Sequence, residues 1–209
     1  VMLDEPLFTA GGSNTVSWIP SEGSLQEDVF YFDWDDPANL IQAVRGLYKA
    51  EGDTLVWTFE NLMDDHRYGY FVKSVFDDGG QQVAIYSDIA TSTQDQLPPE
   101  TVTDPQAILQ DNGSVVLTWN PVTDRTSGVV EYRITRGVDT GTEGVAAVVT
   151  PVEGQVTPYA WTDTNPLGGG TSYYRILAVD GVGNVGDGVR SNGVNADGSG
   201  SNDSPGGDN

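Results

Sequence analysis

Two short stretches of this 209-residue chain share one pattern. Residues 16–20 read Val-Ser-Trp-Ile-Pro, and residues 117–121 read Leu-Thr-Trp-Asn-Pro. In an extended strand alternate side chains share a face, so the first and third residues of each stretch lie together. The proline then ends the strand because it lacks an amide hydrogen. The pattern therefore predicts one β-strand that occurs twice, in two copies of the same domain.

Further strand signals recur in the same order in both halves. They comprise an alternating apolar run, a strand containing tryptophan and a long strand that ends in an acidic turn. In the first half these are Phe30, Phe32 and Trp34, then Leu55–Phe59, then Tyr70–Val75; in the second half they are Tyr132, Ile134 and Arg136, then Tyr159–Thr162, then Tyr174–Val179. The alternating runs differ in register by one residue. Trp18 and Trp119 are 101 positions apart, which is close to the length of one β-sandwich domain.

A leucine and a tyrosine six positions apart also recur, as Leu62 with Tyr68 and as Leu167 with Tyr173. Such a pair predicts a tyrosine corner, in which the phenol hydroxyl bonds to the backbone where the chain crosses between sheets. The spacing from this tyrosine to a valine later on the same strand differs between the copies. Val75 lies seven residues after Tyr68, whereas Val179 lies six residues after Tyr173. Either one residue is missing in the second copy, or its corner residue is not Tyr173.

The fold class predicted from these signals is all-β, with two antiparallel β-sandwiches in tandem. We expect a first domain at residues 1–95, a second at 96–194 and a Gly/Ser/Asp/Asn-rich tail or linker at 195–209. The tail has too few apolar groups to offset the entropy of ordering. The join between the domains is polar and ends in Pro98-Pro99, which favours an extended conformation.

The second copy resembles the fibronectin type III modules of bacterial secreted and cell-surface proteins. The likeness covers residues 97–193, and the residues that carry it are Leu97–Pro99, Val115–Pro121, Asp163–Tyr173 and Ala178–Asp180. The first copy, at residues 3–94, is more divergent. The resemblance implies a β-sandwich fold and an extracellular or cell-surface location. The integrin-binding tripeptide Arg-Gly-Asp of that family is absent from this sequence.

Residues Asp36–Val44 do not follow the strand pattern. Asp36 is a helix-capping residue, Pro37 suits a first helical turn, and Leu40 and Val44 are four apart. A short helix or turn and a β-strand are both consistent with this segment.

The composition excludes several classes of partner. The formal net charge of −22 would repel nucleic acid and anionic membrane surfaces. The sequence has no apolar run long enough to insert into a membrane. It has no cysteine either, so disulfides, thiolate metal sites and a cysteine nucleophile are excluded.

No catalytic residue, cofactor site or metal site is predicted, and we expect the chain not to be an enzyme. Paired acids such as Asp64 and Asp65 point to opposite faces in a strand and are solvated in turns. His66 is the only histidine, so a catalytic triad would depend on it entirely. The acidic loops Asp33–Asp36 and Asp180–Asp187 are calcium candidates by charge alone, since neither has the alternating carboxylates of a calcium loop. Ordinary turn chemistry explains both loops better.

The aromatic residues divide into two groups. We expect Trp18 and Trp119 in the two cores. Tyr31, Trp34, Tyr48 and Trp57 are candidates for an exposed surface that binds carbohydrate or protein, because aromatic rings stack on sugars and dominate protein interfaces. Cross-strand packing within the sheets explains the same four residues equally well.

The function predicted from the sequence is that of a non-catalytic extracellular structural or adhesive module pair. It would be a segment or subunit of a cell-surface or filament assembly and act through protein contacts or self-assembly. Edge strands would be available for pairing with another chain, and the segment Met2–Thr9 could be donated in the same way. The alternative is a spacer or carbohydrate-binding accessory segment of a secreted polysaccharide-degrading enzyme.

Overall fold

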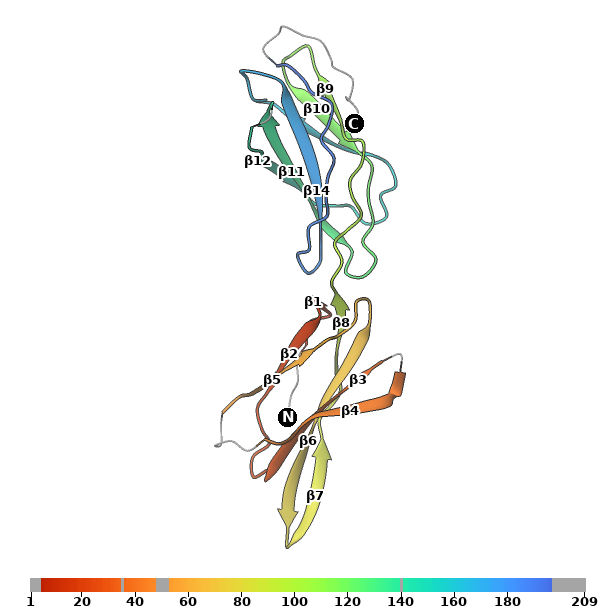
Figure 1. Cartoon of the computed structure of the whole chain (residues 1–209), viewed down its shortest axis with the longest axis vertical. Coiled ribbons are helices and arrows are strands. Elements are labelled where there is room, and N and C mark those ends of the chain that lie inside the picture. The colour runs from red at the N-terminus through yellow and green to blue at the C-terminus, as the bar shows by residue number, and fades with distance from the viewer. Residues whose placement is uncertain (1–4, 35, 48–52, 140, 197–209) are drawn as a thin grey trace. The chain divides into compact units, whose positions relative to one another are not determined.

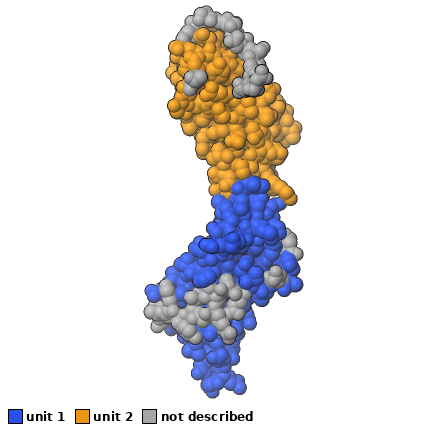
Figure 2. Space-filling view, viewed as in Figure 1, with its two compact units in different colours: residues 1–97 blue, residues 98–209 orange. Residues whose placement is uncertain are grey.

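The computed structural model describes residues 5–34, 36–47, 53–139 and 141–196, and within these ranges it contains strands and turns but no helix. The chain forms two compact units, unit 1 at Val1–Leu97 and unit 2 at Pro98–Asn209 (Figure 2). Each unit is a β-sandwich, so the predicted fold class is confirmed.

In the part of the chain that the structure describes, fourteen strands form the two sandwiches (Figure 1). Those of unit 1 are β1 (Phe8–Ala10), β2 (Ser13–Trp18), β3 (Gln26–Asp33), β4 (Asp36–Leu47), β5 (Leu55–Glu60), β6 (Arg67–Asp78), β7 (Gln81–Tyr86) and β8 (Ala90–Asp95). Those of unit 2 are β9 (Gln106–Leu109), β10 (Val115–Trp119), β11 (Val129–Val138), β12 (Gly144–Val149), β13 (Tyr159–Asp163) and β14 (Ser172–Asp180).

In unit 1 a two-stranded sheet of β2 and β5 faces a larger sheet in the order β1-β8-β6-β3-β4. β7 pairs with the second half of β6, beyond the part of β6 that pairs with β8. The pairing is antiparallel except between β1 and β8, which run parallel. In unit 2 one sheet is β13-β10-β9 and the other is β12-β11-β14.

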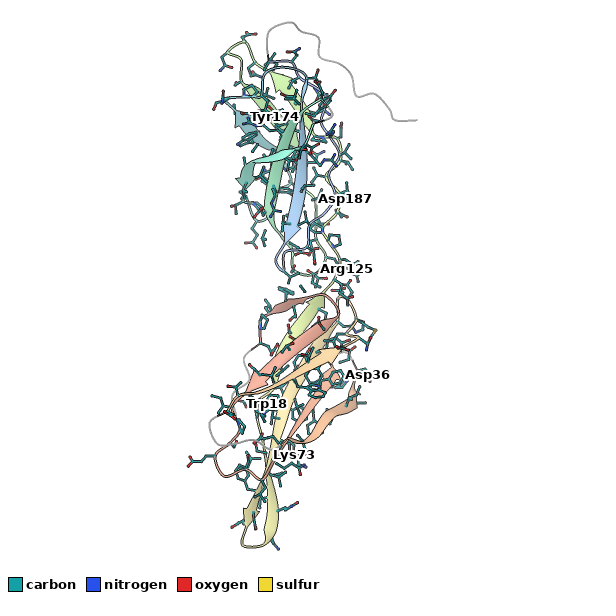
Figure 3. All side chains as sticks on the ribbon, turned by 60° about the vertical axis from the view of Figure 1, so that its left-hand side comes forward. Trp18, Asp36, Lys73, Arg125, Tyr174 and Asp187 are labelled. Carbon is teal, nitrogen blue, oxygen red and sulfur yellow. The ribbon has the colours of Figure 1, made fainter. Side chains whose placement is uncertain are left out.

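Strand alternation fills each core as the repeated motif predicts. On β2, Val16 and Trp18 are buried while the residues between them are exposed, and Trp18 is 1% exposed (Figure 3). On β10, Leu117 and Trp119 are buried in the same way, with Trp119 2% exposed and stacked on Tyr159 at 5.6 Å. Burying such large apolar side chains stabilises each unit by about 2–3 kcal/mol per side chain. The expectation of one tryptophan in each core is confirmed.

The tyrosine corner of unit 1 is present. Tyr68, at the start of β6, accepts a hydrogen bond on its hydroxyl from the Met63 amide at 2.9 Å. Leu62 beside it is 4% exposed and belongs to the core. Burial raises the pKa of Tyr68, so its hydroxyl remains protonated at neutral pH.

In unit 2 the corner is not made by Tyr173, so the tyrosine assignment for the second copy is wrong. Ser172 is fully buried and its hydroxyl donates to the Leu167 carbonyl at 2.9 Å. Val179 lies seven residues after Ser172, the same interval as from Tyr68 to Val75. Unit 2 therefore lacks no residue at this point, and a serine replaces the corner tyrosine.

Residues Asp36–Val44, for which the sequence allowed either a helix or a strand, belong to β4. This strand pairs antiparallel with β3 through several register shifts. Pro37 is tolerated because β4 forms one edge of its sheet. The predicted tail, residues 195–209, falls largely outside the described residues. No helix in the described part of the chain has the length and hydropathy that a membrane crossing requires.

Replacing Tyr68 with Phe should destabilise unit 1 by about 1 kcal/mol, because the Met63 amide loses its hydrogen-bond acceptor. The check is guanidinium denaturation of the full chain, in which only the transition of unit 1 should shift. Tyr86→Phe is the matched control; its ring is exposed, and a change below about 0.5 kcal/mol is expected. Equal effects of the two variants would contradict the corner assignment.

Candidate functional site

The larger sheet of unit 1 has a row of aromatic side chains on the face turned away from the core. β3 and β6 pair so that Tyr31 lies opposite Tyr70, and both contribute to the core side. The next residue pair, Phe30 opposite Phe71, must then point outward. We call the set Phe30, Phe32, Trp34, Phe71 and Tyr86 the outer aromatic face.

The rings of the outer aromatic face contact one another in two groups. Phe30 and Phe71 stack with centroids 5.0 Å apart and planes 7° apart, and Tyr86 of β7 lies 6.1 Å from Phe71. Phe32 and Trp34 stack at 5.7 Å. Trp34 is 41% exposed and Tyr86 59% exposed. Part of this aromatic surface therefore faces solvent.

A glycine makes room for this packing. Gly69 lies directly opposite Phe32, and a Cβ atom at Gly69 would meet the Phe32 ring at 2.5 Å. In unit 2 Gly137 lies opposite Tyr173, but the atoms closest to Gly137 belong to Glu143, and the Tyr173 ring lies against Gly193. An aromatic ring over a cross-strand glycine covers backbone that would otherwise be bare. In unit 1 this ring comes from Phe32 of β3.

Polar groups border the exposed indole. The Arg67 guanidinium carbon lies 4.7 Å from the Trp34 ring centroid, a cation–π contact, and Arg67 also donates to the Thr91 hydroxyl at 2.9 Å. Ile89, which is 50% exposed, extends the apolar surface on the other side of Gly69. This end of the outer aromatic face thus combines an indole, a cation and a hydroxyl, a composition typical of recognition surfaces.

The corresponding face of unit 2 has a different chemistry. Glu143 accepts hydrogen bonds from Arg190 at 2.6 Å, from Thr135 at 2.9 Å and from Arg175 at 3.1 Å. Burial raises the pKa of Glu143, but these three donors outweigh it and hold the pKa below its usual value. Tyr173 lies under the Arg190 guanidinium at 5.5 Å. These charges satisfy one another within the unit.

The four aromatic residues singled out in the sequence do not form one surface. Trp34 belongs to the outer aromatic face. Tyr31 of β3 and Trp57 of β5 are partly buried against the core between the two sheets, where they line an open hollow of about 620 Å³ with Ile41 and Phe59. Tyr48 lies outside the described residues. Binding by these four residues remains a prediction.

Sequence reasoning missed Phe71, Tyr86 and Arg67. A signal for Phe71 was available, because it lies in the strand predicted at Tyr70–Val75 and alternates with core residues. Finding it required the cross-strand register between β3 and β6, which pairs it with Phe30. Tyr86 had no comparable signal, since β7 is exposed along its whole length.

The acidic candidates have structural partners. Asp33 pairs with His66, whose Nδ1 lies 2.5 Å from the carboxylate. Asp180 accepts the amides of Val182 at 3.0 Å and Asn184 at 2.8 Å, and thereby closes its own turn. These are the hydrogen bonds of turn chemistry. Asp35 lies outside the described residues.

Comparison with known proteins identifies the fold. No family model matches the sequence, and no curated protein matches it. Among solved structures, the fibronectin(III)-like modules of Clostridium thermocellum CbhA are 14% identical, with a TM-score of 0.52 over 91% of this chain and 90% of that one. The FN1–FN3 domains of chicken CNTN1 are 17% identical, with a TM-score of 0.50 over 90% of this chain and 68% of that one. The fibronectin type III fold is therefore shown.

Replacing Glu143 with Gln should destabilise unit 2 by about 1–2 kcal/mol at pH 7, since charge-assisted hydrogen bonds are lost. The folded carboxyl has a lowered pKa, so its stabilisation exists above the unfolded value of 4.5 and disappears as pH falls through the folded value. In urea denaturation the difference from wild type should be full at neutral pH and should shrink as the pH is lowered below the unfolded value of 4.5. The exposed Glu153→Gln variant is the control, and a Glu143 effect independent of pH would contradict the assignment.

Proposed function

We propose that this pair of modules with the fibronectin type III fold is a non-catalytic structural and adhesive segment. It acts outside the cell, at a cell surface or within an extracellular assembly, through protein contacts made by the outer aromatic face. The supporting observation is that unit 1 exposes the Trp34 indole and Ile89 on this face, whereas the equivalent face of unit 2 has the ion pairs of Glu143 with Arg175 and Arg190 beside the exposed valines of β12.

The difference between the two units indicates that the outward aromatic rings of unit 1 serve recognition and are not needed for folding. Both units build sandwiches of the same type on a buried tryptophan, so the fold does not require outward aromatic rings. Exposed aromatic surface tends to associate with other molecules and is retained where binding uses it. Trp and Tyr are the residues most enriched among those that dominate interface energies.

A net charge of −22 defines the kind of protein partner. A basic surface would be attracted to the chain, and the Arg67 guanidinium beside Trp34 is a local positive charge. We therefore expect association with a basic protein surface to weaken as ionic strength rises.

The second candidate function is carbohydrate binding by an accessory segment of a secreted polysaccharide-degrading enzyme. One observation favours it: the half-exposed Trp34 indole lies beside the Arg67 guanidinium and the Thr91 hydroxyl. Such a ring with flanking donors suits a sugar ring. Among the described residues of this face the remaining rings stack on each other and add no second exposed ring beside Trp34, so we place the protein partner first.

The test is binding of the fluorescently labelled full chain to intact cells of the source organism. Trp34→Ser combined with Ile89→Ser should lower binding at least about tenfold, since both residues are exposed centres of the proposed surface. Val56→Ser, which removes an equally exposed apolar side chain from β5, should leave binding unchanged.

Protease treatment of the cells separates the two candidates. Loss of binding after protease supports the protein partner. Binding that survives protease and is competed by soluble polysaccharide supports the carbohydrate alternative. If the double variant binds as wild type does, the outer aromatic face has no such role.

A further inference from the structure

The β6–β7 hairpin carries the core-side face of the larger sheet beyond the end of the core. Figure 1 shows this hairpin extending past the other strands of unit 1. β6 buries Val72 in the core, so Ser74 and Phe76, two and four residues later, lie on the same face. The register places Ile85 opposite Ser74 and Val83 opposite Phe76. These residues of β7 therefore lie on the face opposite to the outer aromatic face.

A polar row crosses this face where the core ends. Glu27 of β3 lies opposite Ser74, and Ser74 lies opposite Ile85, so the three residues form one line across the sheet. Ser21, which follows β2, reaches the same row: its amide donates to Glu27 at 3.2 Å, and its hydroxyl lies 3.3 Å from that of Ser74. The Ser74 hydroxyl donates to the Glu27 carboxylate at 3.0 Å. Glu27 thus lies directly behind the two serines.

The charge of Glu27 is buried without a counter-ion. Glu27 is 1% exposed, and its two donors, an amide and a hydroxyl, supply no positive charge. Among the residues that the structure describes, no cation pairs with it, and Lys73 of β6 pairs instead with Asp28 at 3.8 Å. Buried charges in proteins are ordinarily paired, because the low dielectric of the interior screens them poorly. A negative potential therefore extends from Glu27 to the serines in front of it.

A small hollow opens in front of this carboxylate. We call it the serine hollow, and it is lined by Ser21, Ser74, Ile85, Tyr86, Ser87 and Asp88. Its volume is 180 Å³. Pockets that take small molecules have volumes of about 300–1,000 Å³, so the serine hollow has room for the end of one side chain. Asp88 is exposed and offers a second carboxylate that solvent can reach.

Exposed apolar side chains continue from the serine hollow along the hairpin. Ile85 is 57% exposed and Val83 44% exposed, and Phe76 beside Val83 is half-buried. Residues two apart on an extended strand are separated by about 6–7 Å. An extended peptide places its own alternate side chains at the same spacing. A segment lying along β7 can thus put one side chain into the serine hollow and the next one but one on Val83.

We propose that the serine hollow binds an arginine side chain of a partner protein, while Ile85 and Val83 bind an apolar side chain two residues from that arginine. The guanidinium group has five donors in a planar fork and retains its charge when it leaves water. The serine hydroxyls and the Asp88 carboxylate are acceptors for such donors, and Glu27 behind them supplies the compensating charge. The proposal does not depend on the outer aromatic face, which lies on the other side of the sheet.

Other occupants suit the serine hollow less. A calcium ion takes about 6–8 oxygen ligands at once, with several carboxylates among them. Here the Glu27 oxygens accept hydrogen bonds from Ser21 and Ser74 behind the hollow, which leaves the carboxylate of Asp88 to face a ligand. A second copy of this chain has a net charge of −22 and would be repelled. A cationic side chain joined to an apolar one matches both parts of the surface.

The first test is titration of the peptide Gly-Arg-Gly-Leu-Gly, with acetylated and amidated ends, into the full ¹⁵N-labelled chain observed by NMR. The amide shifts should concentrate at Ser21, Ser74, Ile85, Ser87 and Asp88. The dissociation constant should be on the order of 1 mM, since one charged and one apolar side chain are buried. Citrulline in place of arginine, which is similar in shape but neutral, should weaken binding at least about fivefold. Absence of saturable shifts up to about 10 mM peptide, or equal binding of the citrulline peptide, would overturn the proposal.

The second test changes the protein. Asp88→Asn should weaken binding of the arginine peptide about fivefold, whereas Asp111→Asn, which removes the same charge from an exposed position in unit 2, should leave it unchanged. Ile85→Ser should also weaken binding about threefold, and Val56→Ser, at an equally exposed position of β5, should not. All four positions are exposed, and unchanged amide shifts elsewhere show that the fold is kept. Equal effects of the two aspartate variants would mean general attraction to an acidic chain and would exclude the site.

Discussion

The two-residue period of an extended strand governs the whole of each unit. Once Trp18 on β2 and Tyr70 on β6 point into the core of unit 1, every neighbour on those strands must point out. The same alternation that buries Val29 and Val72 leaves Phe30 and Phe71 on the outside, stacked at 5.0 Å. The core and the outer aromatic face are therefore two consequences of one register between β3 and β6.

Much of the fold could be predicted from the sequence because its strongest signals are local. The repeated tryptophan motif predicts β2 and β10, and the leucine–tyrosine spacing predicts the corner at Tyr68. Ser172 escaped prediction because any hydroxyl at that point can satisfy the backbone, and a neighbouring tyrosine offered a stronger pattern. β4 remained ambiguous because Pro37 suits a helix start and an edge strand equally.

The candidate site was less accessible to sequence reasoning, since it depends on which strands are neighbours. Trp34 was visible as an aromatic residue near a strand end, but its contact with Arg67 comes from pairing between separate parts of the chain. Trp57 carries the same residue type on an alternating strand, yet it packs against the core. Residue type alone cannot separate these outcomes. The face on which a side chain lies separates them.

Comparison of the two units shows what each sandwich does with its outward positions. Position by position, Phe71 of unit 1 corresponds to Arg175 of unit 2, since Tyr70 and Tyr174 occupy matching core positions. Arg175 is satisfied by Glu143 within its own unit, while Phe71 stacks on Phe30 and lies 6.1 Å from the exposed ring of Tyr86. The charges of an ion-paired surface already have partners when the surface faces water. An exposed aromatic surface, in contrast, gains free energy when another molecule covers it and removes it from water. Of the two faces, it is that of unit 1 which has a physical reason to bind.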